Sequence, residues 1–80
     1  MVRVDARSSD RVEWLKITGD FFLHPEETLE QIEGCLRGAA IPLDQPALVR
    51  CIEGVLAANG AELIGASPVD IVALLQEAVG

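Results

Sequence analysis

The sequence has few residues that carry out chemistry. Its 80 residues include one histidine, two cysteines, one tryptophan and no tyrosine. It contains no nucleophile elbow, phosphate-binding loop, dinucleotide-binding loop or metalloprotease motif, and its seven glycines do not cluster as they do in a phosphate cradle. The one histidine, His24, has no nucleophile beside it in the chain, so we expect a structural role or a partner contact for it.

Positive charge is also scarce, with six Lys and Arg residues against 13 Asp and Glu residues and a net charge of −7. Because phosphate groups are bound by basic patches, we expect neither nucleic acid nor an anionic membrane as a partner. No apolar run approaches the roughly 20 residues that span a bilayer. The N-terminal residues lack the apolar segment of a signal peptide, and we expect a cytoplasmic protein.

The two cysteines, Cys35 and Cys51, are not arranged as a Cys-x-x-Cys pair. Together with one histidine they give no indication of a zinc site, and we expect no metal. Both fall on apolar stripes of predicted helices, where a cysteine behaves as a small buried hydrophobe. Two such residues are consistent with a reducing compartment.

Half of the residues are hydrophobic, which predicts one folded domain over residues 1–80 and leaves apolar surface for a partner. Alternation of apolar and polar residues predicts a strand over residues 2–6 and another over residues 11–18, joined as a hairpin. In the second strand Leu15 and Ile17 share one face, and Val12 and Trp14 share the other. A short third strand is expected over residues 21–23.

Three helices are expected after these strands. The first begins with Pro25 and ends at Gly38, and the second runs from residue 44 or 45 to a stop at residues 59–60. Residues 63–65 are expected to be an apolar connector, followed by a third helix that Ser67 caps. Strands followed by helices predict the α+β class, with a small antiparallel sheet of two or three strands packed on three helices.

Residues 17 to 27, with the sequence Ile-Thr-Gly-Asp-Phe-Phe-Leu-His-Pro-Glu-Glu, are the most informative run. Their carboxylates are explained by a turn and by a helix start, where acids meet the positive end of the helix dipole. Trp14 is a binding anchor if it lies on the open face of the hairpin, and a core residue if a bulge turns the strand. Our candidate partner-interface residues are Gly19, Asp20, Phe21, Phe22, His24, Pro25, Glu26, Glu27 and Trp14.

This run resembles the small accessory domain of lipoate–protein ligases. That domain occurs as the C-terminal domain of single-chain ligases and as a separate small subunit beside the catalytic one. The resemblance continues through Leu29, Ile32-Glu33 and Leu36-Arg37-Gly38. It returns at residues 62 to 70, Glu-Leu-Ile-Gly-Ala-Ser-Pro-Val-Asp, and extends over residues 12 to 79. Family members usually open with Lys-x-x-Gly-Gly-Lys-Leu, whereas this chain enters its first strand directly.

The resemblance implies a fold like that of iron–sulfur scaffold and sulfur-acceptor proteins, and a non-catalytic role. The ligase joins lipoate and ATP into lipoyl-adenylate and then transfers the lipoyl group to an acceptor protein. Lipoate, ATP and Mg are therefore expected on a catalytic ligase subunit or domain, and no cofactor is expected on this chain. The starting methionine and the length favour a free subunit. The alternatives are a sulfur or iron–sulfur carrier that uses Cys35 or Cys51, and a generic interaction module that self-associates.

Overall fold

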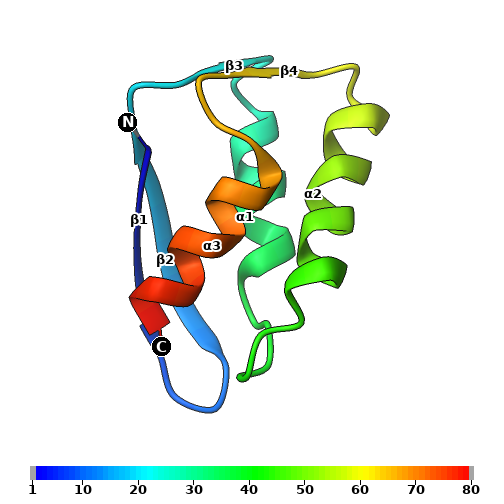
Figure 1. Ribbon diagram of the computed structural model, residues 1–80. Coiled ribbons are helices and arrows are strands. Elements are labelled where there is room, and N and C mark those ends of the chain that lie inside the picture. Colours follow the sequence, from blue (N-terminus) through cyan, green and yellow to red (C-terminus); the bar gives the residue numbers. More distant parts are fainter. Residues whose placement is uncertain (1, 80) are drawn as a thin grey trace.

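A computed structural model describes residues 2–79 as a hairpin, a second small strand pair and three helices (Figure 1). The elements in chain order are β1 (Val2–Ser8), β2 (Val12–Gly19), β3 (Phe22–His24), α1 (Thr28–Leu36), α2 (Gln45–Ala58), β4 (Glu62–Ile64) and α3 (Pro68–Val79). This confirms the predicted α+β class with antiparallel strands and three helices. The expected single sheet is in fact two sheets, because β3 pairs with β4 and not with the hairpin.

The hairpin β1–β2 contains a bulge that decides which side chains face the helices. Arg7 pairs with Trp14, but Ser8 pairs with Val12, so Glu13 is the extra residue. An extra residue reverses the alternation of a strand, and Val12 is therefore fully buried while Trp14 is exposed. The prediction that Val12 shares the face of Trp14 is wrong for this reason.

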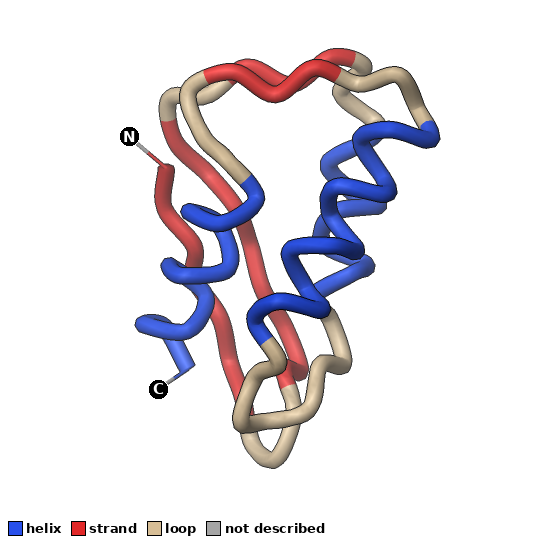
Figure 2. The backbone as a smooth tube through the Cα atoms, turned by 45° about the vertical axis from the view of Figure 1, so that its right-hand side comes forward, coloured by secondary structure: helices blue, strands red, loops and turns tan. Residues whose placement is uncertain are grey.

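The helices all lie on one side of the hairpin (Figure 2). α3 packs against β1, α1 packs against β2, and α2 packs against the other two helices. Every element except β4 contributes buried apolar side chains to one core. Its members are Val2, Val4, Val12, Leu15, Ile17, Leu23, Ile32, Leu36, Ile52, Ile71, Val72 and Leu75.

The first helix begins later than the sequence predicts. The backbone N–H of Thr28 donates to the carbonyl of Pro25 over 3.1 Å, and that of Leu29 donates to Glu26 over 3.0 Å. These bonds reach back three residues and form turns, so residues 25–27 precede the helix. The helix begins at Thr28, and the prediction of Pro25 as its first residue is wrong.

The starts of the other two helices agree with the prediction, because local side chains fix them. The carboxylate of Asp44 accepts a hydrogen bond from the N–H of Ala47 over 3.3 Å, and the hydroxyl of Ser67 accepts one from Asp70 over 3.1 Å. Each satisfies a backbone donor that the helix itself leaves unpaired.

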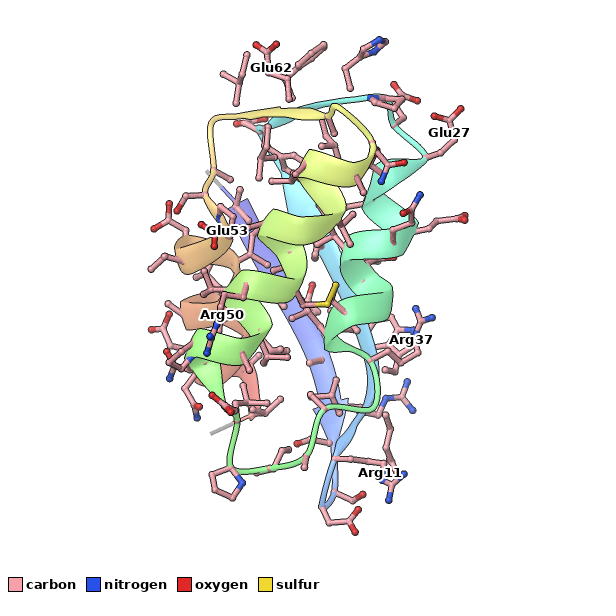
Figure 3. The ribbon with its side chains drawn as sticks, turned by 90° about the vertical axis from the view of Figure 1, so that its right-hand side faces the viewer. Arg11, Glu27, Arg37, Arg50, Glu53 and Glu62 are labelled. Atoms are coloured by element: carbon pink, nitrogen blue, oxygen red, sulfur yellow. A yellow bond between two sulfur atoms is a disulfide. The ribbon has the colours of Figure 1, made fainter. Side chains whose placement is uncertain are left out.

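A disulfide joins Cys35 of α1 to Cys51 of α2, with 6.0 Å between the two Cα atoms (Figure 3). Within residues 2–79 no cysteine is free. The expectation of buried thiols is therefore wrong: the two apolar stripes face each other and bring the sulfur atoms together, and Cys51 is exposed. The disulfide also removes the thiolate that a sulfur carrier would use.

Candidate docking surface

The strands β3 and β4 form a short ribbon at one end of the molecule. Its antiparallel pairs are Phe22 with Ile64, Leu23 with Leu63, and His24 with Glu62. Because side chains alternate along a strand, the central pair points inward and the two outer pairs point outward. We call the outward set, Phe22, His24, Glu62 and Ile64, the ribbon face.

The ribbon face presents large apolar side chains to solvent. Phe22 is 57% exposed and its cross-strand neighbour Ile64 is 52% exposed, whereas the intervening Leu23 is only 7% exposed. The rings of Phe22 and His24 stack at 6.2 Å with 12° between their planes. Exposed apolar side chains that touch each other, and are flanked by polar groups, are typical of protein-binding surfaces.

A groove of about 560 Å³ adjoins the ribbon face. It lies at the end of the molecule where Figure 3 places Glu27 and Glu62. Its lining combines apolar side chains with three carboxylates, and its residues are Phe21, Phe22, Leu23, Glu26, Glu27, Leu29 and Glu30. This composition suits a partner segment that carries an apolar side chain beside basic groups.

The turn at Gly19 and Asp20 lies directly against the chain that follows β4. The ideal β carbon position of Gly65 is 3.1 Å from the backbone oxygen of Asp20 and 3.4 Å from Cα of Phe21. Gly65 also has a φ of +89°, which L-residues rarely adopt. The two sequence motifs that carry the family resemblance are thus in contact, although more than 40 residues separate Asp20 from Gly65.

The structure brings together most of the predicted interface residues. Phe22 and His24 lie on the ribbon face, and Glu26 and Glu27 are exposed beside it. Two others are less available. Phe21 and Pro25 are half-buried, and Phe21 packs against the core.

Trp14 does not belong to this surface. It is 43% exposed on the outer side of the hairpin, where the guanidinium carbon of Arg7 lies 5.7 Å from the centre of its ring. The question that the sequence left open, core or open face, is decided in favour of the open face. Trp14 is therefore exposed on a different side of the molecule from the ribbon face.

Ile64 and Glu62 are not among the residues predicted for the interface, because residues 63–65 were expected to form a connector. A run of three strand residues is too short to show a period. The available signal was the resemblance over residues 62–70, which marks this segment without indicating that it pairs with β3.

In residues 2–79 there is no group of three or more His, Cys, Asp or Glu side chains placed to hold a metal ion. None of the helices in this part of the chain has the length and apolar content to cross a membrane.

Comparisons with known proteins give a structural neighbour and no match by sequence family. No protein-family model matches the chain, and no curated protein matches it. The chain is similar in structure to a solved chain from an archaeal lipoylation system, with a TM-score of 0.69 and 27% identity. That system is a bipartite lipoate protein ligase and its E2 lipoyl domain from Thermoplasma acidophilum. The similarity covers 92% of this chain and 80% of that chain, so the matched chain is itself short.

Proposed function

We propose that this protein is a non-catalytic accessory component of a lipoate–protein ligase. It binds a catalytic subunit or domain and enables the ATP-dependent formation of lipoyl-adenylate, which precedes lipoylation of an acceptor protein. The observation that carries the proposal is the structural similarity, over 92% of the chain, to a short chain from a bipartite lipoate protein ligase system.

The ribbon face supplies the contact in this proposal. Phe22 and Ile64 are adjacent and more than half exposed, and they would lose water on docking. Burial of apolar surface contributes about 25 cal/mol per Å². Together with His24 stacked on Phe22, the two side chains form a compact anchor of the kind that dominates binding energy.

The charges beside the anchor define the partner. Glu26, Glu27 and Glu30 line the neighbouring groove, and Glu62 lies on the ribbon face itself. The catalytic subunit should therefore present an apolar pocket bordered by Lys or Arg side chains. Such pairs at the rim contribute more to orientation and to the association rate than to affinity.

Activation in this proposal is a shift between conformations of the catalytic subunit. Lipoate, ATP and Mg bind there, and the accessory protein binds the adenylating conformation more tightly than the alternative. A ligand shifts such an equilibrium only by its differential affinity. A tenfold rise in the competent population needs about 1.4 kcal/mol of that difference.

The test is to measure pyrophosphate release by the catalytic subunit from the same organism, with lipoate, ATP and Mg²⁺, while this protein is titrated in. We expect release to rise and to saturate. Phe22→Asp should shift the titration to higher concentrations, because it places a charge in the apolar contact. The matched control is Val69→Asp, which changes a residue of α3 that is 61% exposed and is not part of the ribbon face.

Release that is unchanged at a saturating amount of this protein would refute the proposal. The proposal would also be refuted by a stable self-associated form that does not co-elute with the catalytic subunit in size-exclusion chromatography. That behaviour is expected of a generic interaction module. An equal effect of Phe22→Asp and Val69→Asp would retain the accessory role but remove the ribbon face as its contact.

A further inference from the structure

Basic residues are concentrated in one part of this acidic chain. The hairpin β1–β2 and its turn, residues 2–19, contain four of the six basic residues and three of the 13 acidic ones, a net charge of +1. The remainder of the chain carries −8. The basic members of the hairpin are Arg3, Arg7, Arg11 and Lys16.

The register of the hairpin directs three of these cations to its outer side. Arg3, Arg7 and Lys16 alternate with the inward-facing core residues of their strands, and all three are exposed. Trp14 pairs with Arg7 and shares their face. We call Arg3, Arg7, Trp14 and Lys16 the hairpin face. It lies on the side of the hairpin opposite the helices, whereas the ribbon face is at the end formed by β3 and β4 (Figures 1 and 2).

Trp14 is held in place on this face although it is exposed. The guanidinium carbon of Arg7 lies 5.7 Å from the centre of the indole ring, within the range of a cation–π contact. The contact restricts both side chains before any partner arrives, which lowers the entropy lost on binding. Tryptophan and arginine are also the residue types most enriched among binding hot spots.

The cations beside Trp14 are available to a partner. Arg3 has an ion pair with Asp5 over 3.3 Å, but both side chains are well exposed and such pairs contribute little. Asp5 also lies on this face, directly opposite Lys16, so the face carries three cations and one carboxylate. Within residues 2–79 no carboxylate forms an ion pair with Arg7 or Lys16. Trp14 is paired with Arg7 in the regular part of the hairpin, before the bulge at Glu13, so the alternation of the two strands brings the aromatic ring and the cations to one face.

We propose that the hairpin face is a second interaction surface, which binds an acidic protein surface through Trp14 and its flanking cations. Charge complementarity selects the partner, because this is the part of the molecule where the charge is positive. Nucleic acid is anionic along its whole length and would also face the remaining residues, which carry −8, whereas an acidic patch on a protein can be confined to the hairpin face. Binding of the acidic part of a second copy is an outcome that the test below distinguishes.

The test uses Trp14 itself, because the chain has one tryptophan and no tyrosine. The full chain is titrated with poly-L-glutamate while the tryptophan emission is recorded. We expect a saturable change that weakens as salt rises, since the cations are exposed. Lys16→Glu and Arg7→Glu should each weaken binding about tenfold, which corresponds to about 1.4 kcal/mol.

The matched control is Arg50→Glu, which makes the same change of charge at an exposed site on α2. Its effect should stay within about twofold if binding depends on the hairpin face and not on net charge. Circular dichroism checks that each variant is folded. No ligase is present, so the outcome is independent of the proposed function.

Four results would overturn the inference. The first is an emission spectrum that poly-L-glutamate does not change, and the second is a loss of binding in Arg50→Glu equal to that in Lys16→Glu. The third is a DNA duplex that binds more tightly than poly-L-glutamate at the same salt concentration, which would assign the face to nucleic acid. The fourth is an emission that changes with the concentration of the chain alone, which would assign the face to self-association.

Discussion

Gly65 approaches Asp20 so closely that a β carbon on Gly65 would lie 3.1 Å from the backbone oxygen of Asp20. The contact joins the end of β2 to the segment between β4 and α3. It fixes how the ribbon meets the hairpin, because both strands of the ribbon leave from this point.

Gly65→Ala should destabilise the protein by at least about 1–2 kcal/mol, the cost of a left-handed conformation for a residue with a β carbon. Contact with the Asp20 oxygen adds to this cost. Urea unfolding of the parent and of Gly65→Ala measures the difference in unfolding free energy. The control is Gly54→Ala on α2, where a β carbon meets nothing within 4 Å and the change should stabilise the helix by about 0.8–1 kcal/mol. A Gly65→Ala protein as stable as the parent would contradict the close approach.

Deletion of Glu13 should be tolerated by the hairpin. Val12 would then directly precede Trp14 in a regular strand, still opposite Ser8 and still facing the core. Val12→Ser should cost more than the deletion, because it loses the burial of a valine side chain, which contributes about 1.5–3 kcal/mol. Glu13→Ala keeps the bulge and should change the unfolding free energy by less than about 0.5 kcal/mol. Thermal melts of the three variants check this, and a deletion that costs as much as Val12→Ser would show that the bulge itself is needed for Val12 to be buried.

Truncation of two adjacent residues of β3 should lower the unfolding free energy by very different amounts. Leu23→Ala removes a side chain that is 7% exposed in the core and should cost about 2–5 kcal/mol. Phe22→Ala removes one that is 57% exposed and should cost less than about 0.5 kcal/mol. Chemical denaturation of the isolated protein measures both. A large loss for Phe22→Ala would place its ring in the fold and not on a docking surface.

Reduction of the disulfide should lower the unfolding free energy by about 3 kcal/mol, the value for a closed loop of about 15 residues. The loss should appear chiefly in α2, because Ile52 is the one side chain of this helix in the buried core. Melts with and without dithiothreitol measure the effect. A Cys35→Ala/Cys51→Ala variant serves as the control, since its melting temperature should not change with dithiothreitol. A parent protein whose melting temperature is also unchanged would show that the disulfide contributes no stability.

The sequence predicted those parts of the fold that local chemistry determines. Ser67 followed by Pro68 marks the start of α3, because the hydroxyl can accept a bond from Asp70 without any help from the rest of the chain. Val12 was assigned to the wrong face because one bulged residue reverses the alternation, and nothing in the residue types identifies Glu13 as that residue.

The candidate site could not be predicted from the sequence because it depends on pairing between segments that are far apart in the chain. The exposure of Phe22 and Ile64 follows from β3 and β4 meeting, and each strand is only three residues long. The disulfide is similar: Cys35 and Cys51 approach each other because α1 and α2 pack face to face. Patterns within either helix carry no information about its neighbour.

The pairing of His24 with Glu62 places the entry and the exit of the segment that contains α1 and α2 side by side. The parts of the chain outside this segment pack on each other, with α3 against β1. A partner that binds Phe22 and Ile64 therefore holds both ends of the helical pair at once. Any opening that separates β3 from β4 would first have to release that partner, so binding at the ribbon resists the opening of helices that the partner never touches.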